Sequence, residues 1–288
     1  MLNKHDLAQW DILNEIEYGY LYDDIYGKNT SDVELLLSLI GDEPKNILEA
    51  FCGSGRLFIP LAKTGHKMTG FDAHYGMLSR LHQKAKGLSN VRYYYADALR
   101  HEWETGFDVV LVANNVIQNI DHIGSTDPKR ELADYIAAQE LIISKAAQSL
   151  VRGGYLFFTF ELYDIESAEN TFVREPDPEW FTDPDAIDVG NLEAGLYGIR
   201  KKTVNGGDTY DHETRFWKTK RRDITIYPPH GEKHITEYTI YKHNLSLDEA
   251  RKLLTDNGLT IVQEYGDTDK RPLVEGKYNG EASFWAKK

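Results

Sequence analysis

Cysteine is nearly absent from this chain of 288 residues, and the sequence lacks several other features that would define its class. The lone cysteine, Cys52, excludes an intramolecular disulfide framework. No apolar run reaches the roughly 20 residues that a helix needs to cross a bilayer. The N-terminus also lacks the charged-then-apolar order of a secretory signal. We therefore expect a cytoplasmic protein with no membrane segment.

Positive charge is also in short supply. The chain has 46 Asp and Glu against 33 Lys and Arg, a formal net charge of −13. Such a protein repels a phosphate backbone unless its basic residues gather on one face. The dense basic cluster is Lys218-Thr219-Lys220-Arg221-Arg222, and we expect it at the solvated end of a hairpin. A nucleic-acid partner is therefore disfavoured.

Two phosphate-binding signatures are missing as well. The chain has no G-x-x-x-x-G-K-[ST] loop, and Phe58 stands where a dinucleotide fingerprint has its third glycine. What is present is a strand, a turn containing Gly53 and Gly55, a helix, and a second strand that ends in Asp72. Glycines let a ligand approach the turn backbone, and an acid in this place can take both hydroxyls of a ribose. Asp72 has an alternative as a helix N-cap. The pattern favours a nucleoside ligand without phosphate.

These residues resemble the class I S-adenosylmethionine-dependent methyltransferases. The first motif of that family is an acid, a short spacer and C-G-x-G, here Glu49 to Gly55, with Phe51 where many members have Gly or Ala. Further motifs follow in the family's order, and the resemblance covers roughly residues 18–162 well and the last 45 or so residues moderately. It implies S-adenosyl-L-methionine as cofactor, with S-adenosyl-L-homocysteine as product, and says almost nothing about the acceptor. The later motifs are 70–78, 94–98, 107–115 and 151–158.

The resemblance also implies roles for single residues at the adenosine end. Asp72 and the following Ala73 would bind the ribose. Asp97 would accept from the adenine amino group, while the backbone N–H of Ala98 meets a ring nitrogen. Asp97 as an ordinary loop acid is the alternative.

At the methionine end, the resemblance implies that Glu49 lies near the amino group, or accepts backbone N–H groups of the turn. Arg56 would pair with the methionine carboxylate or be exposed to solvent. Asn114 would bond the cofactor or act as a strand-end amide. The turn itself contributes Gly53, Ser54 and Gly55.

The order of hydrophobic runs predicts an α/β fold: a doubly wound, mostly parallel, seven-stranded Rossmann-like sheet with an inserted small antiparallel sheet and an N-terminal helical lid. A hairpin is expected in the insertion from 196–204 and 209–219, joined by Asn205-Gly206-Gly207-Asp208. Ser246 is expected to cap a helix that ends near Asn257. The four parts are a lid at 1–41, a cofactor-binding core at 42–162, the insertion at 163–244 and a C-terminal completion of the core sheet at 245–288.

The lid sharpens the resemblance. Small-molecule methyltransferases similar to the glycine and amino-sugar N-methyltransferases carry a Tyr-Asp-x-x-Tyr lid, matched here by Tyr22 to Tyr26. The resemblance implies that Tyr22 reaches the cofactor or the acceptor amine and takes part in catalysis. A tyrosine that only packs the lid on the sheet is the alternative.

A general base is needed only if the acceptor carries a proton that must leave. His122 ranks first, since loops at the carboxyl ends of parallel strands line the ligand crevice; His230 and His243 are the other candidates. Aromatic residues of the insertion would either wall a pocket for a cationic amine or planar acceptor, or pack one face of the small sheet.

We therefore expect a methyltransferase of a small molecule, directed to nitrogen or oxygen with nitrogen preferred, with no metal and with a homodimer as one arrangement. The alternatives are a peptide or RNA methyltransferase and a non-catalytic regulatory protein that binds the same cofactor.

Overall fold

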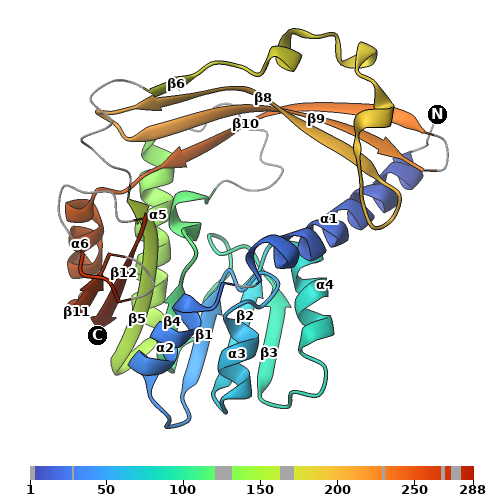
Figure 1. Cartoon of the computed structure of the whole chain (residues 1–288). Helices are drawn as coiled ribbons and strands as arrows, with labels where there is room; N and C mark the ends of the chain where they lie inside the picture. The colour runs from blue at the N-terminus through green and yellow to red at the C-terminus, as the bar shows by residue number, and fades with distance from the viewer. Residues whose placement is uncertain are drawn as a thin grey trace.

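The structure, a computed structural model, describes residues 4–27, 29–120, 132–162, 172–228, 231–266, 270–273 and 280–288. Within these ranges the chain forms one seven-stranded sheet and one five-stranded sheet. The larger sheet stands among helices, and the smaller one lies across the top of the molecule (Figure 1). The predicted fold class is confirmed.

The larger sheet has the strand order β11-β12-β5-β4-β1-β2-β3. β1 lies between β2 and β4 and is parallel to both, while β12 is antiparallel to β5 and to β11. The direction of winding reverses at β1, and ligands of such sheets bind outside the carboxyl ends of the strands at this reversal. The strands are β1 Asn46–Ala50, β2 Lys67–Asp72, β3 Val91–Tyr95, β4 Phe107–Val112, β5 Leu150–Leu162, β11 Thr260–Tyr265 and β12 Gly280–Lys287.

Helices cover both faces of this sheet, because the parallel strands are apolar on both sides. One buried cluster joins the sheet to α5 (Leu132–Ser149) and α6 (Leu247–Asp256), and a second joins it to α2 (Ser31–Ile40), α3 (Phe58–Lys63) and α4 (Tyr75–Lys84). Ser246 and Glu249 form a reciprocal capping box at the start of α6, as predicted for Ser246. No helix among the described residues is long and apolar enough to span a membrane.

The smaller sheet is built between β5 and β11. Ile224 and Ile226 pack with Val204 on one face, where short 3-10 helices bring Trp180 and Ile187 over them. The strands are β6 Phe172–Arg174, β7 Glu193–Ala194, β8 Arg200–Asp211, β9 Phe216–Tyr227 and β10 Glu232–His243, and the 3-10 helices before β7 are Pro178–Phe181, Pro184–Ala186 and Val189–Asn191.

The predicted hairpin turn at Asn205-Gly206-Gly207-Asp208 is wrong. These residues form a bulge inside β8, and the chain turns at 212–215 instead. Gly207 has φ +100°, and a Cβ on Gly206 would lie 2.6 Å from the ring of Trp180. The two glycines therefore serve the bulge and its close packing against Trp180. As a result, the basic cluster at 218–222 lies within a strand and not at a hairpin end.

The lid begins with α1 (Lys4–Tyr26), which crosses the N-terminal end of α4 and extends toward the far end of the small sheet (Figure 1). The two helices approach closely at glycines. A Cβ on Gly76 would lie 1.8 Å from the carbonyl oxygen of Glu15, and one on Gly19 would lie 2.8 Å from that of Gly76. The ring of Tyr18 stacks on His74 beside this crossing, with centroids 5.3 Å apart.

Candidate functional site

The glycine turn after β1 has left-handed backbone at Phe51 (φ +59°), Gly53 (φ +50°) and Gly55 (φ +83°). A Cβ on Gly53 would meet nothing closer than 3.9 Å, so the surface there is open to a ligand. A Cβ on Gly55 would lie 2.4 Å from Leu81, so this glycine is required by packing against α4. Phe51 adopts this conformation with strain, whereas a glycine in its place would be free of it.

Asp72, at the end of β2, is held between the turn and the start of α4. Its Oδ2 accepts from the backbone N–H of Gly53 at 2.8 Å, and its Oδ1 accepts from that of His74 at 2.7 Å. Burial raises the pKa of Asp72 against the effect of these N–H groups. The N-cap of α4 is His74, which accepts from the N–H of Met77, so the N-cap alternative for Asp72 is wrong. The carboxylate is fixed beside the exposed Ala73 at the mouth of the crevice.

Asp97 and Ala98 follow β3 at the same edge of the sheet. Oδ1 of Asp97 accepts from the backbone N–H of Leu99 at 2.9 Å, and Arg100 lies 3.5 Å from its other oxygen. The carbonyl of Ala98 accepts from the indole N–H of Trp103 at 2.9 Å. Asp97 is thus ordered by its own loop, and its adenine-binding role stays a prediction.

Glu49 is the buried acid of the site. Only 3% of it is exposed, and its Oε2 has no hydrogen-bond partner among the described residues. Burial, opposed by Arg56 and reinforced by Asp32 and Asp72, holds the pKa of Glu49 well above its usual value. A carboxyl group in this state gains most from a cationic donor placed against it.

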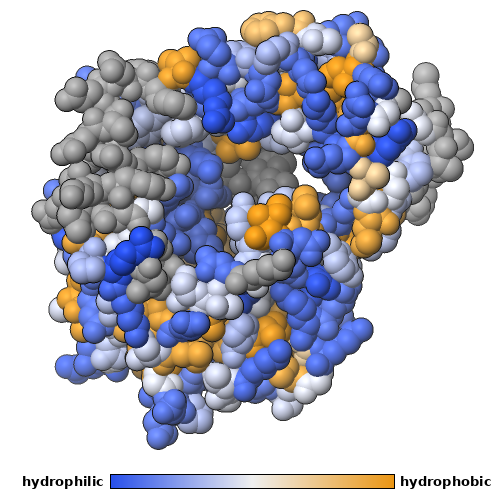
Figure 2. Space-filling model, viewed as in Figure 1, coloured by the Kyte–Doolittle hydropathy of each residue, from blue (hydrophilic) through white to orange (hydrophobic). Residues whose placement is uncertain are grey.

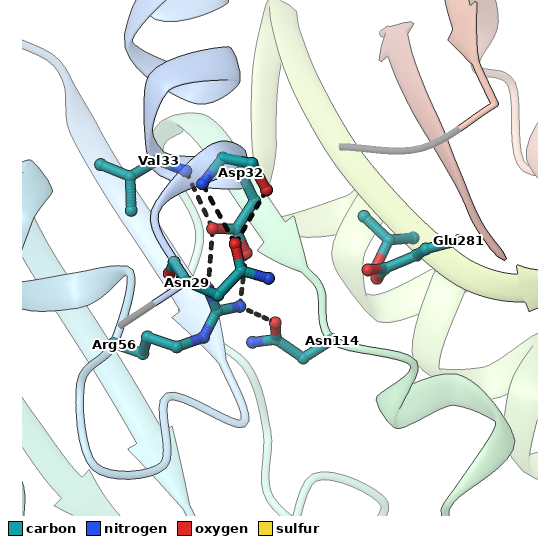
Figure 3. Close-up of polar contacts among 8 residues, drawn as sticks. Asn29, Asp32, Val33, Arg56, Asn114 and Glu281 are labelled. Carbon is teal, nitrogen blue, oxygen red and sulfur yellow. Dashed lines mark hydrogen bonds and ion pairs between the residues drawn. The ribbon is translucent and has the colours of Figure 1, made fainter. Parts of the chain in front are cut away.

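Arg56 is buried, so the expectation that it is exposed to solvent is wrong. Its guanidinium makes a bidentate ion pair with Asp32 of α2, donates to the carbonyl oxygen of Asn29 at 3.0 Å, and donates to the side-chain oxygen of Asn114 (Figure 3). Only 9% of the Arg56 side chain and 5% of the Asp32 side chain are exposed. It also lies close enough to Tyr22 of α1 to oppose the rise in the pKa of that phenol. Arg56 therefore joins α1, α2 and the end of β4.

Asp32 was missed by the sequence analysis. It lies in the first turn of α2, where an acid is common because of the helix dipole. The available signal was its position on the apolar face, three and four residues before the buried Leu35 and Leu36. An acid on such a face needs a buried partner.

Two left-handed asparagines follow β4, Asn114 at φ +63° and Asn115 at φ +58°. The amide of Asn114 is bound by Arg56, so it is oriented by protein at the point where the crevice passes from β1 to β4. Strained backbone of this kind collects at functional sites.

Asp23 ties the lid to the glycine turn. It accepts from the Ser54 hydroxyl at 2.6 Å, from Arg80 at 2.6 Å and from Lys84 at 2.9 Å. Burial works to raise the pKa of Asp23, but these three donors outweigh it and hold the pKa below its usual value. The predicted cofactor residue Ser54 thus already serves the lid. Beside Asp23, burial raises the pKa of Tyr22 although Arg56 opposes this.

The candidate bases give a mixed picture. His122, predicted to be catalytic, and His230 lie outside the described residues. His243 is 3% exposed, and its Nδ1 lies 2.8 Å from the amide oxygen of Gln139 on α5. That histidine joins the small sheet to the core. No group of three or more potential metal ligands occurs among the residues that the structure describes.

Comparison with known sequences agrees with this geometry. Residues 47–135 match the profile of a family described as a methyltransferase domain. The chain is 28% identical over 148 residues to the 23S rRNA (uracil(1939)-C(5))-methyltransferase RlmD of Aeromonas salmonicida, a match that spans 48% of this chain and 33% of that protein. The chain thus covers about a third of the length of the curated relative.

Solved structures share the fold over nearly the whole chain. The CcbJ methyltransferase from Streptomyces caelestis has a TM-score of 0.59 at 16% identity, covering 92% of this chain and 95% of its own. The sugar N-methyltransferase KedS8 from Streptoalloteichus sp. ATCC 53650 has a TM-score of 0.58 at 12% identity, with coverages of 92% and 90%. An S-adenosylmethionine-dependent methyltransferase from Clostridium acetobutylicum has a TM-score of 0.60 at 14% identity, with coverages of 94% and 97%.

Proposed function

Because the chain carries a class I S-adenosylmethionine-dependent methyltransferase domain, we propose that the protein transfers a methyl group from this cofactor to a small-molecule acceptor at nitrogen or oxygen. The observation that supports it best is the pair of acids at the edge of the core sheet. Asp72 is fixed against the turn with open space over Gly53, and Glu49 is buried with no partner for Oε2 in the described part of the chain. A ribose suits the first acid and an ammonium group the second.

In this proposal the described residues hold the cofactor at three places. Asp72 and Ala73 bind the ribose, and Asp97 with the N–H of Ala98 binds the adenine. Gly53, Gly55 and Glu49 face the methionine end, where Glu49 takes the amino group. Four of the five N–H donors of Arg56 already have protein acceptors, so Arg56 acts by holding Asn114 and the lid in place.

Bound cofactor supplies an electrophilic methyl group on a sulfonium. The protein then has to hold the acceptor lone pair in line with that methyl group at near-attack distance, which contributes several kcal/mol. Tyr22, which lies within electrostatic range of Arg56 beside Asn114, is the described residue best placed to orient the acceptor. An amine acceptor must also lose a proton, for which His122 remains the proposed base.

The small sheet, which lies over the carboxyl ends of the core strands, supports a small acceptor. KedS8, by its name a sugar N-methyltransferase, shares the fold across 92% of this chain. The insertion at 163–244 has more residues than the part of the chain that does not match KedS8. The small sheet therefore belongs to the shared architecture and encloses the carboxyl ends of the core strands (Figure 1).

An RNA acceptor is the second candidate, because the matched relative is named as an rRNA methyltransferase. Methylation at carbon 5 of a uracil calls for a nucleophile that first adds to the ring, and a thiolate suits that step. The chain's single cysteine, Cys52, is 3% exposed, and burial holds the pKa of its thiol well above the usual value. That chemistry is therefore disfavoured here.

The test has two stages. Calorimetric titration of the purified protein with S-adenosylmethionine and S-adenosylhomocysteine should show one site for each. Isotope-labelled methyl groups should then pass into the small-molecule fraction of a metabolite extract and not into peptide or RNA pools. Labelled RNA alone would favour the second candidate, and no binding of either compound would refute both.

Tyr22→Phe tests the orienting role. Loss of one hydrogen bond of about 0.5–1.5 kcal/mol should lower kcat roughly 2- to 12-fold, while affinity for S-adenosylmethionine stays unchanged. Tyr26→Phe is the matched control on the neighbouring ring, 4.8 Å away. Unchanged kcat and KM in Tyr22→Phe would mean that this tyrosine only packs the lid.

A further inference from the structure

Ile224 and Ile226 of β9 lie on the face of the small sheet that the 3-10 helices cover, and Phe216 on the same face packs against Tyr135 of α5. Side chains alternate along β9, so the residues next to these point to a second face. Arg221 is on this second face, and its cross-strand partner Tyr238 lies within electrostatic range of Tyr18 on α1. Figure 2 shows the hollow between this face and the core. We call this face the crevice roof, defined by Trp217, Arg221, Tyr238 and Lys242.

Lys242 is the unusual residue of the crevice roof. It pairs in register with Trp217 and is half-buried, and its ammonium makes no hydrogen bond or ion pair with any described residue. Burial lowers the pKa of Lys242, as does nearby Arg221, while Glu161 at the end of β5 and Asp208 oppose the shift. Lys242 therefore lies within electrostatic range of Glu161, which belongs to the carboxyl end of a core strand.

Two other described lysines with a pKa lowered by burial make the contrast clear. Lys84 donates to Asp23, and Lys145 donates to the carbonyl oxygens of Ala98, Leu99 and His101 at 2.8–3.1 Å. Each of these two cations is compensated by the protein. Lys242 has no such partner among the residues that the structure describes, although burying an ammonium group without a partner is unfavourable.

Arg221 adds a second cation to the crevice roof. Its nearest acid is Asp208, 3.4 Å away, and Asp208 is shared with Arg174, also at 3.4 Å. Only 3% of Asp208 is exposed, so its carboxylate lies inside the small sheet, where these two arginines share it. Lys242 and Arg221 thus leave positive charge directed at the hollow in a chain whose net charge is −13.

We propose that Lys242 and Arg221 form a subsite for an acid group, a carboxylate or a phosphate, carried by the methyl acceptor. The inference rests on the proposed function, because it treats the hollow as the acceptor site. An anionic group placed there gains two charge-assisted donors and compensates the buried ammonium. The nearby Glu161 favours the protonated form of Lys242 in the absence of ligand. The acceptor is accordingly an acid as well as a nucleophile.

The experiment uses inorganic phosphate and acetate as probes for the two sources of charge, at constant ionic strength. Wild-type protein is acylated with a lysine reagent, and modification of Lys242 is followed by peptide mass spectrometry. The effective probe should slow labelling of Lys242 by the factor 1 + [L]/Kd and leave the exposed Lys220 unaffected. Whichever probe protects identifies the kind of acid group.

Variants make the test independent of labelling chemistry. The probe should raise the Tm of the wild type and of Lys220→Gln, but not that of Lys242→Gln, and Arg221→Gln should reduce the shift. Equal labelling of Lys242 at all concentrations of both probes, or an undiminished Tm shift in Lys242→Gln, overturns the proposal. Affinity for S-adenosylmethionine is measured in parallel and should not change in Lys242→Gln; its absence in the wild type would refute the proposed function alone.

Discussion

The two sides of the crevice differ in how their charges are compensated. At the cofactor edge of the core sheet, Asp72, Asp23 and Arg56 each have two or more protein partners. On the crevice roof, Lys242 has none among the described residues, and Arg221 has one long contact with an acid. On the core side, protein partners hold the charged side chains in place before any ligand binds. On the crevice roof, the positive charges are fully compensated only when an anionic ligand binds.

This difference suits a two-substrate enzyme. The cofactor is the same in every reaction cycle, so groups that are fixed in advance lose little freedom on binding it. Glu49 is the exception on the core side, since no described residue is a partner for its buried Oε2. The following changes test the contrast, starting with the largest expected effect.

Asp32→Asn should lower the free energy of unfolding by about 3 kcal/mol, because it leaves the buried guanidinium of Arg56 without its countercharge. Urea denaturation measures the change. Glu34→Gln is the matched control, an exposed acid in the same turn of α2, and should have almost no effect. Equal stability of the two variants would mean that the Arg56 cluster is not a structural centre of the cofactor edge.

Asp72→Ala should weaken binding of S-adenosylmethionine roughly 10- to 100-fold, the range expected when hydrogen bonds to a charged group are lost. Calorimetry measures the affinity, and circular dichroism checks that the unliganded variant is folded. Retention of wild-type affinity by a folded variant would remove the ribose assignment.

Glu49→Gln should change how stability depends on pH. Because the folded pKa of Glu49 is raised, the wild type loses stability as pH rises above the unfolded value of about 4.3, by at most ~1.4 kcal/mol per pH unit. The variant lacks this loss, so its advantage over the wild type grows with pH in urea titrations. Glu104→Gln has the opposite expectation, since Arg92 holds the pKa of Glu104 below its usual value. If the free energies of unfolding of Glu49→Gln and the wild type changed with pH in the same way, the raised pKa of Glu49 would be refuted.

Lys242→Met should raise the Tm of the unliganded protein slightly, equivalent to about 1 kcal/mol, because it removes an uncompensated buried charge. Lys145→Met should lower the Tm, because it abandons three carbonyl acceptors. A fall in Tm for both variants would show that Lys242 is compensated and would abolish the contrast between the two sides.

Local patterns predicted most of the core. The glycine turn and the acids at the ends of β1 and β2 are recognisable within about 25 residues of sequence, and the alternation of strands and helices predicted the class of the sheet. The small antiparallel sheet was predicted, but its hairpin was misplaced, because Gly206 and Gly207 serve a bulge that packs against the ring of Trp180 and not a turn. A glycine pair alone does not distinguish a bulge from a turn.

The sequence analysis missed the contacts of the site between residues that are far apart in the sequence. Asp32 meets Arg56 from 24 residues away, and Asp23 meets Ser54, Arg80 and Lys84 from 31 to 61 residues away. No period or motif links such positions in one sequence. The contacts of Asp23 depend on Gly19 and Gly76, which let α1 lie against α4.

The small sheet is held by the rest of the protein at both of its ends. Its β9 and β10 have 12 residues each, a span of roughly 40 Å. At one end Gln139 and Glu249 support His243 and Arg215, and at the other Glu17 of α1 lies against Gly195. Lengthening or shortening the elements that support either end changes the space between the small sheet and the core, without changing Asp72 or Glu49. Acceptor size can therefore drift during evolution while the cofactor edge stays constant.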